Sequence, residues 1–184
     1  MGAVPSFNDS GLLPAGDHVA TFEELRDSVL TKGDGLDDWD EAWRLTLIGN
    51  AEVLVAQLWQ VGITDIFLDG SFVESKAHPN DIDGYFICDL MDFASGSLQR
   101  RLNAIDPYKV WTWDPALRRA YRGFTKGQLP MWHRYRVELY PHYGQPSGIL
   151  DEHGNQQLFP AAFRKQRQTF EPKGVIHVVK GGIR

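Results

Sequence analysis

The chain has 184 residues, of which 42% are hydrophobic and 23% charged; this is an ordinary globular composition and excludes a disordered chain. The formal net charge of -5 conceals an uneven distribution, because residues 1–93 hold 18 acidic and 4 basic residues and residues 94–184 hold 6 and 15. The two halves are either solvated surfaces, or acids gathered around a metal with bases from the second half facing phosphate.

Simple sequence features also limit the cellular setting. No apolar run approaches the roughly 20 residues that a membrane helix needs. The first ten residues, MGAVPSFNDS, lack the basic and apolar regions of a signal peptide. The single Cys88 excludes an internal disulfide and a cysteine-based zinc cluster. We therefore expect a cytoplasmic protein that makes no membrane contact.

The first third of the chain predicts an extended arm followed by helices. Residues 1–20 are rich in Gly, Pro and polar side chains and predict an extended N-terminal arm, with a single domain over 21–184. Thr21 and Glu24 form a capping-box pattern that opens a short helix through Leu30. A longer helix is expected from about Asp38 to Gln60. Its apolar residues recur at helical spacing and predict a core-facing stripe: Trp39, Trp43, Leu47, Leu54 and Leu58.

The rest of the chain alternates strand-like and helical patterns. The predicted strands are 64–69, 82–89, 136–140 and 174–179, and the predicted helices are 96–105 and 156–167. Residues 109–136 are aromatic and basic without a clean period. Helices followed by interspersed strands indicate an α/β or α+β fold with a mixed central sheet flanked by helices.

Residues 68–86, LDGSFVESKAHPNDIDGYF, contain a pattern that demands an explanation. Asp81 and Asp83 flank one isoleucine at the start of a predicted strand, so both carboxylates project to the same face. Two carboxylates about 4 Å apart near a surface repel by roughly 4 kcal/mol at intermediate dielectric. A hard divalent cation such as magnesium would offset that repulsion. The alternative is a polar, solvent-facing strand start.

The Asp pair follows a second small motif, Gly70-Ser71, which comes directly after a predicted strand. There a small residue lets backbone amides approach a phosphate, and the Ser71 hydroxyl adds a donor. Strand, Gly-Ser, short connection and D-x-D together resemble the nucleotidyltransferase superfamily of the DNA polymerase β type, especially its small stand-alone bacterial and phage members. The resemblance covers residues 64–89 and extends to about residue 140. It implies a polymerase β-like nucleotidyltransferase domain.

The resemblance also implies site residues. Gly70 and Ser71 would hold a nucleoside triphosphate, with Lys76 as a further phosphate contact or a mobile surface lysine. Asp81 and Asp83 would bind two magnesium ions. A third carboxylate is expected on a later strand, and Glu138 in the run 136–140 is the candidate for a catalytic and metal-binding role. Its alternative is a salt bridge with Arg134 or Arg136.

The implied activity is transfer of a nucleoside monophosphate from a nucleotide, ATP above all, to a hydroxyl of a protein, an RNA or a small molecule. Either Glu138 or Asp83 would accept the proton of that hydroxyl. Small members of the superfamily often belong to toxin–antitoxin or phage-defence pairs, which implies a cognate partner protein. The competing hypothesis is a non-catalytic antitoxin or adaptor that binds a partner protein or RNA.

Other chemistry-bearing residues have weaker patterns. Three nearby arginines are candidates for triphosphate or acceptor contact, or else form a solvated face: Arg118, Arg119 and Arg122. Trp111, Trp113 and Trp132 could stack a base but fit a structural role better. The six histidines show no metal-ligand spacing, although His133 and His142 flank the predicted Glu138 strand.

Overall fold

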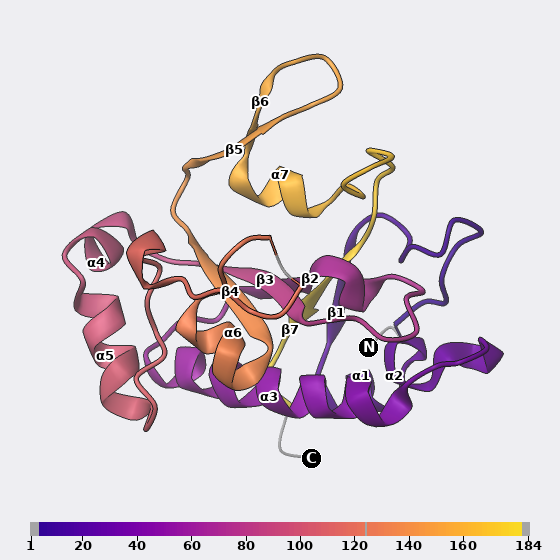
Figure 1. Cartoon of the computed structure of the whole chain (residues 1–184), viewed down its shortest axis with the longest axis horizontal. Helices are drawn as coiled ribbons and strands as arrows, with labels where there is room; N and C mark the ends of the chain where they lie inside the picture. Colours follow the sequence, from indigo (N-terminus) through magenta and orange to yellow (C-terminus); the bar gives the residue numbers. More distant parts are fainter. Residues whose placement is uncertain (1–3, 124, 182–184) are drawn as a thin grey trace.

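A mixed five-stranded sheet forms the centre of the molecule (Figure 1). The structure, a computed structural model, describes residues 4–123 and 125–181. In spatial order the strands are β1 (Asp17–Ala20), β7 (Val175–Val178), β2 (Ile66–Asp69), β3 (Ile82–Ile87) and β4 (Val137–His142). β1 is parallel to β7 and β3 to β4, whereas β2 is antiparallel to both of its neighbours. The predicted mixed α/β class is confirmed.

One face of the sheet packs on the long helix α3 (Glu41–Gln60), which Figure 1 shows beneath the strands. Alternate strand residues such as Leu68, Ile82 and Phe86 point to this face and join Leu54 and Leu58 of α3 in the main core. The helices around α3 are α1 (Phe22–Arg26), α2 (Val29–Lys32), α5 (Ser97–Ile105) and α6 (Pro130–Tyr135). A short helix, α4 (Leu90–Ala94), precedes α5.

The opposite face carries a smaller layer built from the segment between β4 and β7. This segment contains the hairpin strands β5 (Pro146–Leu150) and β6 (Gln156–Leu158) and the helix α7 (Phe159–Phe163), and Figure 1 shows it above the sheet. Phe159 and Phe163 pack against Phe67, Tyr85 and Val175 of the sheet. These aromatic contacts cover one part of the face to which Asp83 also points.

The helix predictions from local signals match the structure closely. Thr21 and Glu24 form the capping box, since the Thr21 Oγ1 accepts from the Glu24 N–H at 3.2 Å and Glu24 Oε2 from the Thr21 N–H at 2.8 Å. The helix ends at Arg26, however, and α2 begins separately after a Ser28 cap. α3 begins at Glu41 behind an Asp40 cap, so Trp39 lies before the helix.

Other boundaries differ from expectation for physical reasons. Residues 17–20 of the predicted arm form β1, because they pair with β7, a partner far away in sequence. The expected helix over 156–167 is mostly wrong: β6 occupies its start and only Phe159–Phe163 is helical, with Pro160 in the first turn. β4 continues through Pro141 to His142, which an edge strand tolerates.

The helices were also compared with the length that a bilayer requires. Within residues 4–123 and 125–181, none is both long and apolar enough to cross a membrane.

Candidate functional site

The Gly70-Ser71 pair forms a tight turn at the end of β2. Gly70 has φ 77°, a left-handed conformation that glycine adopts without strain, and it opens the 3₁₀ turn η2 (Gly70–Val73). A Cβ at Gly70 would lie 2.8 Å from Asp83 Oδ2, closer than carbon and oxygen tolerate. Both the left-handed φ and the close contact with Asp83 therefore require glycine at position 70. Ser71 is the next residue of this turn.

Four carboxylates, which we name the acidic row, lie on the sheet face opposite α3. Asp69 of β2 pairs with Asp83 of β3, and Asp83 pairs with Glu138 of β4. Residues directly opposite one another in a sheet share a face, and Asp81, two residues before Asp83, projects to that face as well. Glu138 therefore lies beside Asp83, as strand alternation predicted.

The four acids differ in their partners. Asp81 Oδ2 accepts a hydrogen bond from the Trp132 Nε1–H at 2.6 Å. Asp69 pairs with the buried ammonium of Lys173 at 3.1 Å, and Lys173 also contacts Glu74 at 2.8 Å. Asp83 is the exception: no donor in the described part of the chain reaches its carboxylate. The row thus has an uncompensated carboxylate at its centre.

The pKa values reflect this imbalance of charge. Burial, followed by the charges of Asp81, Asp69 and Glu138, raises the pKa of Asp83 to about 8. Burial also raises the pKa of Asp81, although the hydrogen bond from Trp132 opposes the shift. Burial raises the pKa of Asp69 to about 7 against the opposing charge of Lys173. A cation bound in the row would relieve all three carboxylates.

Glu138 is occupied by partners that the sequence did not indicate. Its Oε1 accepts from the Leu129 N–H at 2.8 Å and from Arg118 Nη1 at 3.4 Å, while Oε2 accepts from the Tyr140 hydroxyl. The expected alternative, a salt bridge with Arg134 or Arg136, is wrong because the cation comes from Arg118, whose segment folds back over β4.

These contacts bear on the expectation that Asp81, Asp83 and Glu138 hold metal together, which stays a prediction. Across residues 4–123 and 125–181, no group of three or more His, Cys, Asp or Glu side chains is arranged to hold a metal ion. Glu138 shares the face of Asp81 and Asp83, yet both of its oxygens are held by protein donors. Asp81 and Asp83 supply oxygen donors of the hard kind that divalent cations bind.

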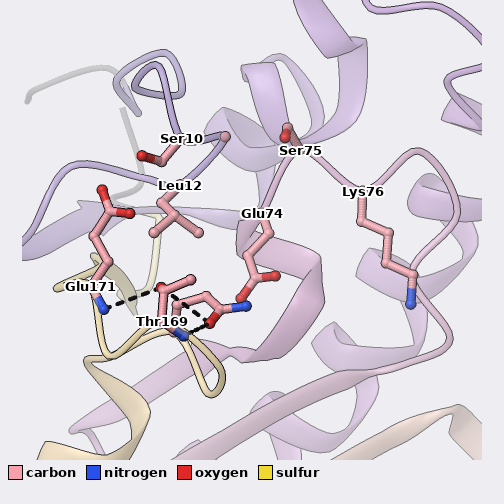
Figure 2. A pocket seen from close by; sticks show the side chains of 9 residues that line it. Ser10, Leu12, Glu74, Ser75, Lys76, Thr169 and Glu171 are labelled. Carbon is pink, nitrogen blue, oxygen red and sulfur yellow. Dashed lines mark hydrogen bonds between the residues drawn. The ribbon is translucent and has the colours of Figure 1, made fainter. Parts of the chain in front are cut away.

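The other candidates separate into contacts near the row and contacts away from it. Lys76 is exposed, and Figure 2 shows its side chain directed away from the neighbouring pocket residues, while its positive charge favours a lower pKa of Asp81. Arg118 joins the row through Glu138 and also donates to the Tyr140 hydroxyl at 3.0 Å. Arg119 and Arg122 are solvent-facing, in line with the solvated-face interpretation.

The tryptophans and histidines have structural contacts. Trp111 is fully buried and donates to Gln57 at 2.5 Å, and Trp113 donates to the Leu139 carbonyl at 2.8 Å. His133 contacts the Arg119 carbonyl, and His142 stacks on Phe159. Trp132 is the residue of this group that reaches the row, as a hydrogen-bond donor to Asp81.

A hollow of about 380 Å³ lies beside the turn, between the N-terminal segment, the residues after η2 and the loop before β7 (Figure 2). Its wall includes Glu74, which Lys173 links to Asp69. Asp69 and Lys173 were both missed at the level of sequence. Asp69 looked like the end of a buried strand, and only the antiparallel register with β3 brings it opposite Asp83.

The comparisons with known proteins give one match. Residues 5–179 match DUF6932, a family of unknown function. The chain belongs to DUF6932. No curated protein and no solved structure matches it. The function of this DUF6932 protein is therefore inferred from the arrangement of its own residues.

Proposed function

We propose that this DUF6932 protein is a metal-dependent nucleotidyltransferase with a polymerase β-like fold. It would move a nucleoside monophosphate from a nucleoside triphosphate, ATP above all, to a hydroxyl of a protein, RNA or small-molecule acceptor. The observation that carries the proposal is the unpartnered Asp83 carboxylate, held between Asp81 and the Gly70 turn. The Gly70 turn, whose amides could bind phosphate, and the Asp83 carboxylate, which could bind a cation, are therefore adjacent.

The residues present fit magnesium on the basis of their donors. Magnesium binds through one or two carboxylates and completes its shell with water and substrate phosphates. Asp81 and Asp83 would hold it, in one ion or a pair of ions, and Glu138 would keep its present partners. Bound magnesium would supply positive charge that stabilises the triphosphate and the departing pyrophosphate.

The chain's own groups have separate parts in this scheme. The Ser71 hydroxyl and the turn amides would donate to triphosphate oxygens. Asp83 is better placed than Glu138 to accept the acceptor's proton, because protein donors already occupy both oxygens of Glu138. Glu138 instead anchors Arg118 and the Leu129 amide at the rim of the row.

A second candidate function is supported by those same Glu138 contacts. If the third acid serves only to hold Arg118, the protein is a non-catalytic member of the fold that binds a partner protein or an RNA through its basic second half. In this alternative the acidic row is a remnant, and a toxin–antitoxin or phage-defence setting would require only binding.

A transfer assay distinguishes the nucleotidyltransferase from the non-catalytic binding protein. Purified protein would be incubated with labelled nucleoside triphosphates, magnesium and cell extract, alongside Ser71→Ala, Asp81→Asn and the control Ser97→Ala on α5. We expect labelled product with wild type and the control, strong loss with Ser71→Ala and none with Asp81→Asn. Calorimetry should show magnesium-dependent nucleotide binding. Binding that ignores magnesium and both site substitutions would reject the enzyme hypothesis.

A further inference from the structure

Arg136 occupies a constrained position next to Asp81. It follows α6 and precedes β4, and it has φ 55° and ψ 37°, a left-handed conformation in which glycine is the usual residue. Its carbonyl accepts the Ile82 N–H at 3.0 Å, so the start of β4 is fixed against the start of β3. Arg136 and Asp81 are therefore neighbours across the two strands.

The Arg136 guanidinium lies against two aromatic rings that also contact each other. Its central carbon lies 3.9 Å from the Trp132 ring centroid and 4.2 Å from that of Tyr121, and the two centroids are 4.9 Å apart. Trp132 is the residue whose indole N–H donates to Asp81. Contact with the two rings restricts the orientation of the planar group.

The N–H groups of the Arg136 side chain have no protein acceptor in the described part of the chain. Throughout residues 4–123 and 125–181, no carbonyl or carboxylate accepts a hydrogen bond from the Arg136 side chain, and it forms no ion pair. Its neighbour Arg134, also stacked on a ring, donates to the Tyr108 hydroxyl at 2.7 Å. Arg136 is thus oriented by packing, while its hydrogen-bonding capacity stays available beside the acidic row.

We propose that Arg136 binds a phosphoryl group at the Asp81 end of the acidic row. A planar guanidinium matches two phosphate oxygens with two parallel N–H donors, and its contact with the two rings removes part of its hydration. The phosphoryl group belongs either to the nucleotide or to a nucleic-acid acceptor strand. The inference rests on the proposed function, since transfer requires a phosphate to approach the Asp81–Asp83 pair.

The binding itself is tested without metal or turnover. Calorimetry in chelator would titrate inorganic pyrophosphate into wild type, Arg136→Met, Arg136→Lys and the matched control Arg134→Met. We expect measurable binding by wild type and the control, within about twofold of each other. Arg136→Met should weaken binding about tenfold or more, as expected for loss of a charged, two-donor contact. Arg136→Lys retains the charge but not the fork, so it should give an intermediate loss.

Two further arms identify the source of the phosphate and isolate this inference from the proposed enzyme activity. ATP and a single-stranded RNA oligonucleotide replace pyrophosphate, and the one whose binding depends on Arg136 is the source. Asp81→Asn should bind metal-free pyrophosphate at least as well as wild type, although it should lose transfer activity. Undetectable pyrophosphate binding by wild type, equal binding by wild type and both Arg136 variants, or an equal loss in Arg134→Met would overturn the proposal.

Discussion

The Asp83 side chain shows how a single residue can set the pH dependence of the whole fold. Its pKa of about 8 in the folded protein lies above the ordinary value of 3.8, so the folded state retains a proton that the unfolded chain releases. The stability that this proton represents is fully present below about pH 4 and is lost as the pH rises through about 8. Asp69, with a pKa of about 7, acts in the same direction.

We therefore expect metal-free wild type to melt at progressively lower temperature between pH 5 and pH 9. Asp83→Asn removes the ionisable group and should flatten this decline, leaving the slope that comes from Asp69. At pH 9 the variant should be more stable than wild type by up to about 2 kcal/mol. Thermal melts in chelator measure this, with the exposed Asp37→Asn as a control that should follow wild type. A variant less stable than wild type at pH 9 would contradict the prediction.

At the scale of elements, α3 controls the loop that joins the two halves of the site. Arg44 is fully buried, and its guanidinium donates to the carbonyls of Leu30, Phe72, Glu74 and Lys76 at 2.5–3.1 Å. Its face stacks on Trp39 at 3.9 Å. Three of the four carbonyls belong to the chain between the Gly70 turn and Asp81, so this one side chain fixes the loop in place.

Arg44→Met should destabilise the protein by at least about 3 kcal/mol, because several buried carbonyls lose their donor at once. Urea unfolding gives the value. The control is Arg26→Met, which breaks a largely exposed ion pair with Glu52 and should cost less than about 1 kcal/mol. Similar losses for the two variants would show that Arg44 does not hold the loop.

Gly84 in the middle of β3 provides a second test at this scale. A Cβ there would contact the Phe67 carbonyl oxygen and lie 2.8 Å from Leu139 Cδ2, which explains why glycine stands in the middle of this strand. Gly84→Ala should destabilise by about 2 kcal/mol or more, because β2 and β4 must move apart.

The matched control for Gly84 is Gly49→Ala on α3, where an added Cβ meets nothing within 4 Å. Alanine favours a helix interior over glycine by about 1 kcal/mol, so this variant should be stabilised. Chemical unfolding of the two variants measures their free energies of unfolding. Equal effects of the two substitutions would mean that the close approach at Gly84 is unimportant.

The elements that could be predicted from the sequence are those fixed by neighbouring residues. The capping box at Thr21, the long helix α3, and the strand–turn–strand unit around Gly70 depend on periodicity and turn chemistry within a few positions. The boundaries of the helices shifted: α3 begins three residues later than expected, behind the Asp40 cap, and the helix after Thr21 ends four residues early, at Arg26, before the Ser28 cap of α2.

The elements that could not be predicted depend on long-range pairing. β1 has only four residues, and it is a strand because β7 adds beside it. Arg118 reaches Glu138 from 20 residues away, and Lys173 reaches Glu74 from 99 residues away. Periodicity contains no information on such pairs, so the sequence indicated Asp81, Asp83 and Glu138 but neither Asp69 nor the cations that neutralise the acidic row.

At the scale of the whole molecule, the uneven charge of the two halves has a spatial counterpart. Asp69, Asp81 and Asp83 come from the acidic first half of the chain. Lys173 of the basic second half pairs with Asp69, and Arg118 of the same half pairs with Glu138. Even so, Asp83 stays without a partner, so folding alone does not neutralise the row.

A ligand that completes the row should therefore stabilise the entire fold. Magnesium with nucleotide at a hundredfold excess over the dissociation constant should raise the free energy of unfolding of wild type by roughly 2.7 kcal/mol. Asp81→Asn keeps an oxygen that can accept the Trp132 hydrogen bond, but it lacks the charge that would hold the metal. This variant should lose most of the ligand-induced gain.

The metal-free comparison distinguishes a binding site from a structural ion pair. If the row awaits a cation, Asp81→Asn in chelator should be as stable as wild type or up to about 2 kcal/mol more so, because one repelling charge is gone. If Asp81 served a structural pair, its loss would leave a buried partner uncompensated and the variant would melt lower. Thermal melts of wild type, Asp81→Asn and Asp37→Asn, in chelator and then with magnesium and nucleotide, separate the two cases. A clearly lower melting temperature of Asp81→Asn in chelator would rule out the metal site.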